Sequence, residues 1–245
     1  MLRIIKQRLR TCLSRVGLDV RIASNIMGFD PVQDIQKLHV GEAFKTVIDI
    51  GANVGQSALR FHKAFPEASI HSFEPVIASY HCGTEATVKY PAIVWHHCAV
   101  GNANKRIVFY SSWTSQMNSI SNASASQCTE AGERNEVEMV RFDDFYIAEK
   151  LNHVDLLKTD TEGFDLAVLE GASATLAGQH VSFVLCEVGF QQADKGHSFF
   201  PSIADYLERF EYRLVGFYGI SDIVHFRQHG GTYADALFTV PHRHV

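Results

Sequence analysis

Small and acidic residues follow two apolar runs of the kind that form buried parallel strands. The first run leads into Asp49-Ile50-Gly51-Ala52-Asn53-Val54-Gly55, and the second ends at Glu74. Glycines at such a turn let a strand pass tightly into a helix, whose first N–H groups remain free to bind a ligand. A carboxylate at the end of the next strand can accept hydrogen bonds from both hydroxyls of an adenosine ribose. These residues therefore predict a site for an adenosine-containing cofactor.

The glycine spacing narrows the choice of cofactor. The turn does not contain the G-x-G-x-x-G run that brings a backbone against a pyrophosphate. The chain also has no G-x-x-x-x-G-K-[ST] phosphate loop. A glycine turn followed by an acidic residue fits both a dinucleotide and S-adenosylmethionine, but this turn lacks the glycines that a dinucleotide requires.

A second group of carboxylates follows the later apolar runs. Asp160 ends one expected strand, Glu162 follows it, and Glu187 ends the next strand. Ligands bind at the carboxyl ends of the strands in an open α/β sheet, so we expect these three residues beside the cofactor. A carboxylate there could take the proton of an acceptor hydroxyl, or two could hold a divalent cation, although the sequence requires no metal ion. Glu162 could instead cap the helix that follows.

Other side chains leave the choice of base open. Lys158 precedes Asp160 by two residues on the same expected strand and could pair with a carboxylate. His153 and His197 lie in expected loops and are further candidates for proton transfer. A single histidine among 13 is more often a surface or hydrogen-bonded residue, so neither is assigned this role.

The elements that must position these residues alternate between strands and amphipathic helices. This alternation predicts one doubly wound α/β domain with a mostly parallel, Rossmann-like sheet. The last two strands have no clear helical period between them and are expected to form an antiparallel pair at the edge. The expected strands are 46–50, 69–73, 92–100, 154–159, 181–187, 212–217 and 236–240, and the expected helices are 56–65, 78–89, 165–176 and 203–210.

Residues 105–142 interrupt this rhythm. Strands are expected at 106–110 and 137–142, with a polar segment at 111–136 between them. A connection of this length is usually functional or disordered. Trp113 lies there among short polar side chains, a mixture suited to a carbohydrate, so contact with the acceptor is one hypothesis and a surface insertion without ligand contact is the other.

The first twenty residues predict a basic amphipathic helix. Apolar residues recur there at helical spacing between basic ones, and no acidic residue precedes Asp19. We expect a helical extension over 1–43 and the main domain over 44–245. The helix could pack on the domain, attach to an anionic membrane surface, or serve as a mitochondrial-type presequence.

Composition excludes several classes of protein. The chain has 245 residues and a net charge of −5, without the basic excess of a general nucleic-acid binder. No apolar stretch approaches the ~20 residues of a membrane-spanning helix. Five scattered cysteines argue against a disulfide framework and favour reduced thiols in the cytoplasm. A cytoplasmic location, with attachment to a membrane surface as an alternative, is expected; the oligomeric state is not readable.

Four segments together resemble one known family. They are VIDIGANVGQSALRF (47–61), SIHSFEP (69–75), CAVGN (98–102) and VDLLKTDTEGFDLAVLEGA (154–172), and they resemble the FkbM family of S-adenosylmethionine-dependent methyltransferases. The resemblance runs from about residue 44 to the C-terminus. It implies a class I methyltransferase fold, S-adenosylmethionine as cofactor, and methyl transfer to a hydroxyl of a sugar, glycan precursor or glycosylated metabolite.

The resemblance also implies roles for individual residues. Glu74 matches the ribose-binding acid, and Ala99 and Val100 lie where adenine is expected. Asp160 would face the methionine amino group or the reacting centre. The first cofactor motif, at the methionine end, is matched by Asp49, Gly51, Asn53 and Gly55. The candidate catalytic residues are Asp160, Glu162 and Glu187.

Two other functions are alternatives to methyl transfer. A nicotinamide-dependent oxidoreductase could use a similar sheet, but the glycine spacing disfavours it. A non-catalytic cofactor-binding or scaffold protein could keep the fold. The presence of Asp49, Glu74 and Asp160 together argues against that second alternative.

Overall fold

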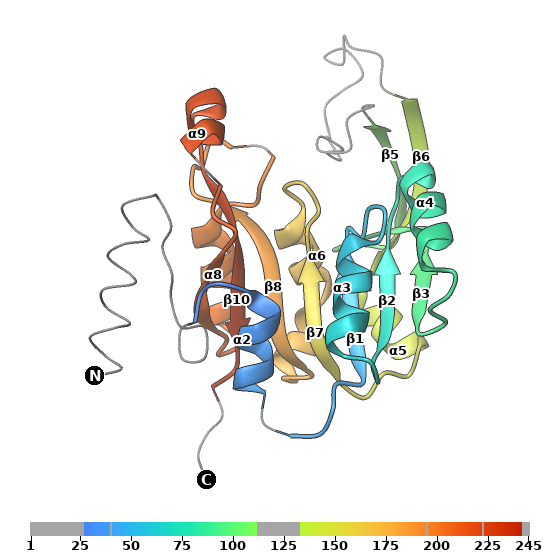
Figure 1. The fold of residues 1–245 in the computed structure, drawn as a ribbon. Coiled ribbons are helices and arrows are strands. Elements are labelled where there is room, and N and C mark those ends of the chain that lie inside the picture. Colours follow the sequence, from blue (N-terminus) through green and yellow to red (C-terminus); the bar gives the residue numbers. More distant parts are fainter. Residues whose placement is uncertain (1–26, 40, 112–132, 195, 222, 242–245) are drawn as a thin grey trace, which may run out of the picture.

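The computed structural model describes residues 27–39, 41–111, 133–194, 196–221 and 223–241 (Figure 1). The basic helix expected over residues 1–20 and the acceptor contact expected of Trp113 lie outside these ranges. Both stay predictions.

A seven-stranded sheet forms the centre of the molecule (Figure 1). Its strand order is β3-β2-β1-β7-β8-β10-β9, and β10 runs antiparallel to both β8 and β9, whereas the other neighbouring pairs are parallel. This confirms the predicted α/β fold class, with the refinement that β10 lies between β8 and the edge strand β9. The bounds are β1 Thr46–Ile50, β2 Ser69–Phe73, β3 Ile93–His96, β7 Val154–Thr159, β8 Val181–Gly189, β9 Arg213–Tyr218 and β10 Tyr233–Thr239.

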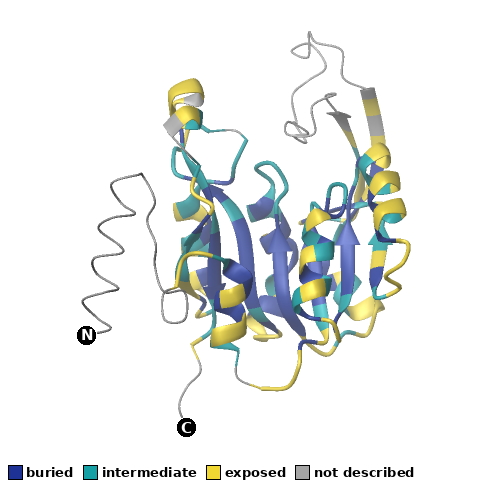
Figure 2. Ribbon diagram, in the orientation of Figure 1, coloured by how far each residue is buried: buried dark blue, intermediate teal, exposed yellow. Residues whose placement is uncertain are grey.

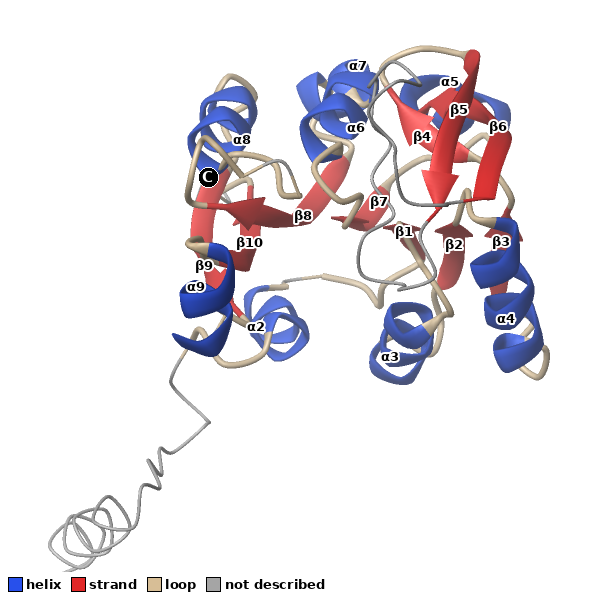
Figure 3. Ribbon diagram, turned by 90° about the horizontal axis from the view of Figure 1, so that it is seen from above, coloured by secondary structure: helices blue, strands red, loops and turns tan. Residues whose placement is uncertain are grey.

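Helices cover both faces of this sheet (Figure 3). One layer contains α2 Pro31–Leu38, α3 Gln56–Ala64 and α4 Ile77–Thr87, and the other contains α5 Phe142–Ala148, α6 Asp165–Gly171, α7 Ser173–Ala177 and α8 Phe200–Glu208. A further helix, α9 Ile223–His229, connects β9 to β10, where the sequence predicted no helix. The single helix predicted over 165–176 is two helices, α6 and α7. None of the described helices combines the length and hydrophobicity needed to cross a bilayer.

The central strands are buried on both faces, which explains their nearly continuous apolar sequences (Figure 2). On β1, Val47 packs towards α2 and α3, whereas Ile48 and Ile50 pack towards α6, α7 and α8. Asp49 and Lys158 break this pattern near the ends of β1 and β7 while remaining buried. Buried charges that interrupt a core are uncommon and mark this edge as a site.

A second, three-stranded sheet was not predicted. It consists of β4 Ala99–Gly101, β5 Lys105–Ser111 and β6 Glu133–Arg141 in the order β4-β6-β5. The single strand predicted over 92–100 is therefore wrong: β3 ends at His96, and the chain enters the second sheet at Ala99. The buried side chains of Ala99, Val137 and Met139 pack together there, so these apolar residues serve the second sheet. Residues 133–136, expected in a loop, belong to β6.

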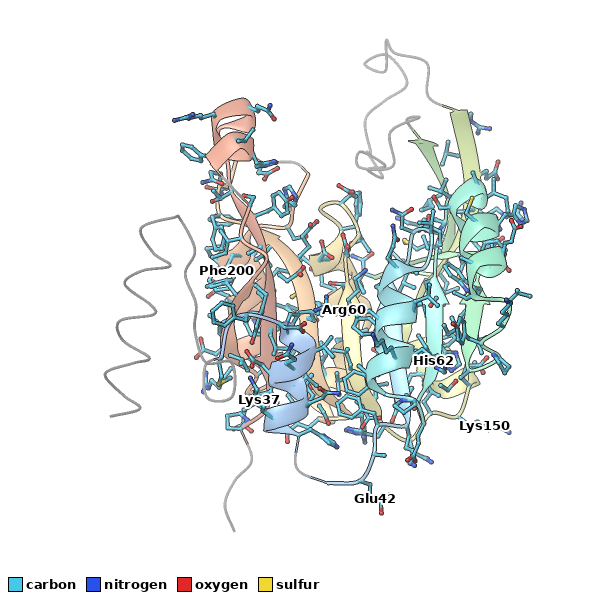
Figure 4. The ribbon with its side chains drawn as sticks, viewed as in Figure 1. Lys37, Glu42, Arg60, His62, Lys150 and Phe200 are labelled. Carbon is cyan, nitrogen blue, oxygen red and sulfur yellow. The ribbon has the colours of Figure 1, made fainter. Side chains whose placement is uncertain are left out.

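The helix α2 is joined to the main sheet by its own contacts. Val32 and Ile35 pack in the same cluster as Phe61 of α3. The Tyr218 hydroxyl of β9 donates to Asp34 Oδ2 at 3.0 Å. Arg60, labelled on α3 in Figure 4, pairs with Asp30 at the start of α2 at 2.8 Å. The domain boundary expected at residue 44 stays a prediction.

A buried histidine, His71, and a half-buried one, His96, predict that the fold is sensitive to acid. His71 Nδ1 lies 3.1 Å from His96 Nε2, and Phe145 of α5 packs edge-on against both rings. Burial, and then the neighbouring His71, lowers the pKa of His96 from 6.5 to about 4, and burial also lowers the pKa of His71. Unfolding frees both rings to take up protons near their ordinary pKa. The free energy of unfolding should therefore fall as the pH drops from about 6.5 towards about 4, with no contribution from this pair above that window.

Urea unfolding of the wild type and of His96→Gln at about pH 7.5 and about pH 5 measures this effect. The variant should lose less stability than the wild type between the two conditions. Equal losses would show that the histidine pair does not carry the acid sensitivity.

Candidate active site

The carboxyl ends of β1, β2, β7 and β8 meet at the upper edge of the sheet in Figure 1. The chain leaves β1 for α3 on one face and leaves β7 for α6 on the other (Figure 3). The strand order reverses between these two neighbours, which is where open α/β sheets bind ligands. The Asp160 N–H donates to the Ile50 carbonyl at 3.1 Å, so the loops that follow β1 and β7 begin side by side.

Glycine is required at two positions of the loop after β1. Gly51 has a φ of 76°, and a Cβ there would lie 1.8 Å from the Asp160 carbonyl oxygen. Gly55 has a φ of 92° and immediately precedes α3, where its Cβ would press against Trp95 and Thr87 at 3.2 and 3.3 Å. The glycines therefore bring the first loop against the end of β7 and start α3 at the same edge.

Glu74 is fixed by two backbone donors. The N–H of Asn53 donates to its Oε2 at 2.9 Å, and the N–H of Val76 donates to its Oε1 at 2.8 Å. Asn53 has a φ of 48°, a left-handed conformation that asparagine tolerates better than most residues. Burial raises the pKa of Glu74, and the two backbone hydrogen bonds oppose that rise. Each carboxylate oxygen keeps a further lone pair, so the group fits the two ribose hydroxyls of the expected cofactor.

Replacing Glu74 tests this assignment. Glu74→Gln should weaken S-adenosylmethionine binding by about 1–3 kcal/mol, because one carboxylate acceptor becomes an amide donor facing the ribose and the Asn53 or Val76 N–H. Isothermal titration calorimetry measures the change. The matched control is Glu67→Gln, an exposed glutamate paired with Lys45, which should bind as the wild type does. Unchanged affinity in Glu74→Gln would remove Glu74 from the cofactor site.

Lys158 joins three parts of the site through one buried ammonium. Its Nζ lies 3.1 Å from Asp49 Oδ1 and 3.3 Å from Asp160 Oδ2, and it donates to the Gly51 carbonyl at 3.0 Å. Burial alone would lower the pKa of Lys158, but Asp160 and Asp49 outweigh it and raise the pKa, so the side chain stays charged. The expected pairing of Lys158 with a carboxylate is confirmed.

Asp49 is fully buried and connects β1 to α3. Its Oδ2 accepts a hydrogen bond from the Ser57 hydroxyl in the first turn of α3 at 2.6 Å, and its Oδ1 faces Lys158. The structure therefore gives Asp49 a positioning role for the first loop, and its direct contact with the cofactor stays a prediction. Ser57 was missed in the sequence, where a serine at a helix start carries no distinctive signal.

Further carboxyl groups lie along the same edge. Lys158 pairs in register with Leu185, and Glu187 pairs with Asp235 of β10, so Asp160, Glu187 and Asp235 are level on neighbouring strands. Burial, followed by Asp160, raises the pKa of Glu187 to about 10. Burial and Asp160 also raise the pKa of Asp235. Burial and the repulsion of its acidic neighbours therefore favour the protonated, neutral form of Glu187 at neutral pH.

Glu162 has the pKa expected of a base at neutral pH. Burial, and then Asp160 and Asp165, raises its pKa to about 7. It does not cap α6: that helix begins after Phe164, and no side chain caps its first turn. The Thr161 N–H of the preceding turn donates to Asp165 Oδ1 at 3.2 Å. The alternative reading of Glu162 as a helix cap is therefore wrong, because the residue has a φ of 52° in the preceding turn.

The two candidate histidines are at opposite ends of the sheet. His153 immediately precedes β7 and lies 2.7 Å from the Ser182 hydroxyl near the start of β8, so it is not at the site. His197 lies beside Glu187, with 3.7 Å between Nε2 and Oε2. Within the described ranges, no group of three or more His, Cys, Asp or Glu side chains is arranged to hold a metal ion.

Comparisons with solved structures give several distant similarities. A protein of the NADB-Rossmann superfamily from Streptococcus agalactiae is 11% identical with a TM-score of 0.47, covering 94% of this chain and 73% of its own. A TehB-like SAM-dependent methyltransferase from Corynebacterium glutamicum is 13% identical with a TM-score of 0.42, covering 98% and 97%. TrmK of M. capricolum, in complex with S-adenosyl-homocysteine, is 8% identical with a TM-score of 0.44, covering 87% and 70%.

The decisive comparison is with protein families. No curated protein matches the chain. The methyltransferase FkbM domain matches residues 49–214, a range that includes Asp49, Glu74, Asp160 and Glu187. The family match confirms the expected resemblance and, with it, S-adenosylmethionine as the cofactor. The chain belongs to the FkbM family of S-adenosylmethionine-dependent methyltransferases.

Proposed function

We propose that the protein transfers a methyl group to a hydroxyl of a sugar, a glycan precursor or a glycosylated metabolite. The observation that carries the proposal is the group of carboxyls formed by Asp160, Glu162 and Glu187 beside the cofactor loop. Carboxyl groups are strong hydrogen-bond partners for hydroxyls, and one of them, Glu162, has its pKa raised to about 7. A hydroxyl acceptor needs such a base, because its oxygen is a weak nucleophile until the proton leaves.

The chain's own residues have distinct parts in this reaction. S-adenosylmethionine, when bound, supplies a methyl group attached to a sulfonium sulfur. The leaving group is S-adenosylhomocysteine, in which this sulfur is a neutral thioether. Glu74 and the loop from Gly51 to Gly55 hold the cofactor, and Lys158 keeps that loop against the end of β7. Asp160 orients the hydroxyl that is methylated, Glu187 holds the acceptor beside it, and Glu162 takes the proton of that hydroxyl as the new oxygen–carbon bond forms. Orientation of this kind supplies much of the acceleration in an in-line displacement.

Glu162→Gln tests the base. Its turnover should fall about 10²–10⁴-fold, while the affinity for S-adenosylmethionine stays close to that of the wild type. Wild-type turnover should rise with pH through about 7, since Glu162 must lose its proton before it can accept another. That rise should be absent in the variant. The exposed Glu85 of α4 offers a control, Glu85→Gln, with wild-type turnover and pH profile.

An assay with radiolabelled methyl groups tests the proposed function itself. The wild type would be incubated with [methyl-³H]-S-adenosylmethionine and the methyl glycosides of glucose, mannose, galactose, rhamnose and fucose, together with the matching nucleotide sugars. The expected product is a methyl ether, identified by mass spectrometry. Label on no member of the panel would contradict the carbohydrate acceptor. A parallel reaction with EDTA decides whether a divalent cation assists, because full activity after chelation excludes that route.

The cellular setting is also part of the proposal. The mildly acidic net charge of −5 supports a small-molecule or glycan acceptor over nucleic acid. A cytoplasmic place in glycan biosynthesis fits such an acceptor. The basic pattern of residues 1–20 supports contact with an anionic membrane surface, which vesicle sedimentation would test against a variant without those residues.

A further inference from the structure

The loop after β8 folds back along its own strand. The Gly189 N–H donates to the Ser198 carbonyl at 2.8 Å, and Gly189 also bridges to Phe199. This path brings His197 over the carboxyl end of β8. The imidazole stacks on the Tyr233 ring of β10 with 4.5 Å between centroids and 8° between planes. His197 is therefore held by the fold beside the acids at the carboxyl ends of β7 and β8 and near the start of β10.

Asp194 fixes which nitrogen of His197 carries the proton. Its Oδ1 accepts from the Gly196 N–H at 2.9 Å, and its Oδ2 lies 2.8 Å from His197 Nδ1. A carboxylate accepts hydrogen bonds, so Nδ1 carries a proton that it donates to Asp194. In the neutral imidazole the lone pair then lies on Nε2, which faces Glu187 Oε2 at 3.7 Å.

The Glu187 carboxyl is a hydrogen-bond donor, whereas His197 Nε2 is an acceptor. It is surrounded by Asp160, Asp165, Glu162 and Asp235, and burial together with these acids keeps its carboxyl protonated at neutral pH. The Nε2 of His197 is thus an acceptor and the Glu187 carboxyl a donor. The 3.7 Å between them is too long for a direct hydrogen bond and leaves both atoms able to reach one oxygen placed beside them. A hydroxyl group, with one O–H and two lone pairs, satisfies both.

We propose that His197 and Glu187 form a subsite for a second hydroxyl of the acceptor, so that the acceptor is a neutral polyol with two neighbouring hydroxyls. One hydroxyl is methylated beside Glu162, and the other is bound between His197 Nε2 and the Glu187 carboxyl. His197 is then a specificity-determining residue. This inference rests on the proposed function and adds the arrangement of the acceptor's hydroxyls to it.

Nuclear magnetic resonance tests the protonation of His197 without any acceptor. Long-range ¹H–¹⁵N spectra of ¹⁵N-histidine-labelled protein with S-adenosylhomocysteine should show His197 protonated at Nδ1 only, its signals being assigned by their loss in His197→Phe. In Asp194→Asn, whose amide can donate to Nδ1, the proton should move to Nε2. A wild-type imidazole protonated at Nε2, in either charge state, overturns the proposal.

Kinetics test the second hydroxyl. The substrates are the methyl glycoside that the wild type methylates and its monodeoxy analogues. For the wild type, loss of one neighbouring hydroxyl should raise KM about 5–150-fold with little change in kcat. His197→Phe, which keeps the ring stack, and Asp194→Asn should raise KM for the full glycoside by a similar factor and no longer distinguish the deoxy analogue. Cofactor affinity should stay unchanged in both.

The control and the contrary results separate this inference from the proposed function. His153→Gln, at the other end of the sheet, should keep wild-type constants for every substrate. If the wild type methylates a glycoside but both His197→Phe and Asp194→Asn still distinguish its deoxy analogues, the subsite is refuted and the proposed function stands. If the wild type methylates no hydroxyl, the proposed function falls and this inference falls with it.

Discussion

Gly51→Ala is expected to abolish S-adenosylmethionine binding and to destabilise the fold by about 3–5 kcal/mol. A Cβ at this position would lie 1.8 Å from the Asp160 carbonyl oxygen, which belongs to the neighbouring strand end. The backbones of Gly51 and Asp160 cannot move apart without separating the ends of β1 and β7. The cofactor loop and the carboxyl group of Asp160 meet at those ends. Urea unfolding and calorimetric titration with S-adenosylmethionine measure the two effects.

A second glycine variant distinguishes the effect of the steric clash from the effect of the left-handed backbone conformation. Gly28 has a φ of 97°, also in the left-handed region, but a Cβ there meets no atom within 4 Å. Gly28→Ala should therefore cost only the conformational strain of about 1–2 kcal/mol and leave cofactor binding intact. Similar losses in the two variants would show that the close approach of Gly51 to Asp160 is not the cause.

Lys158→Met is expected to lower the free energy of unfolding by about 3–5 kcal/mol. The substitution keeps most of the side-chain volume but leaves Asp49, which is fully buried, without the cation 3.1 Å from its Oδ1. It also removes the donor to the Gly51 carbonyl, so cofactor affinity should fall as well. Urea unfolding at neutral pH measures the stability change.

A double variant distinguishes charge from packing. Asp49→Asn combined with Lys158→Met removes both charges of the pair, and the double variant should be more stable than Lys158→Met alone. The exposed pair of Lys45 and Glu67 has a similar separation of 3.0 Å, so Lys45→Met is the matched control and should change stability little. A Lys158→Met variant no less stable than this control would contradict the role of Lys158.

The central strands could be predicted from local sequence. The runs 46–50, 69–73 and 154–159 match β1, β2 and β7 because both of their faces are buried, which leaves apolar, largely β-branched runs. The second sheet could not be predicted, since Ala99–Gly101 pairs with residues 40 positions later, and local periodicity carries no information about such a partner. The short helices α5 and α9 were missed for a related reason: seven residues give too few turns for a period.

The residues of the candidate site also fall into those that could be predicted from the sequence and those that could not. Asp49, Glu74, Asp160 and Glu187 could be located because they lie at or close to the carboxyl ends of strands, and the topology of an α/β sheet brings those ends together. Asp235 was missed because its relation to Glu187 depends on the antiparallel register of β10. The pairing of Asp194 with His197 depends on a loop path set by the hydrogen bond from Gly189 to Ser198. Nothing in the spacing of those residues along the chain indicates it.

The most direct test of the central claim is calorimetric titration of the wild-type protein with S-adenosylhomocysteine, with NAD as the comparison ligand. The residues around Gly51, Glu74 and Lys158 are predicted to bind S-adenosylhomocysteine with micromolar affinity, and Glu74→Gln to weaken that binding. NAD should give no binding heat, because the loop lacks the glycines that admit a pyrophosphate. Binding of NAD without binding of S-adenosylhomocysteine, or binding of neither, would contradict the assignment of this edge as a methyltransferase site.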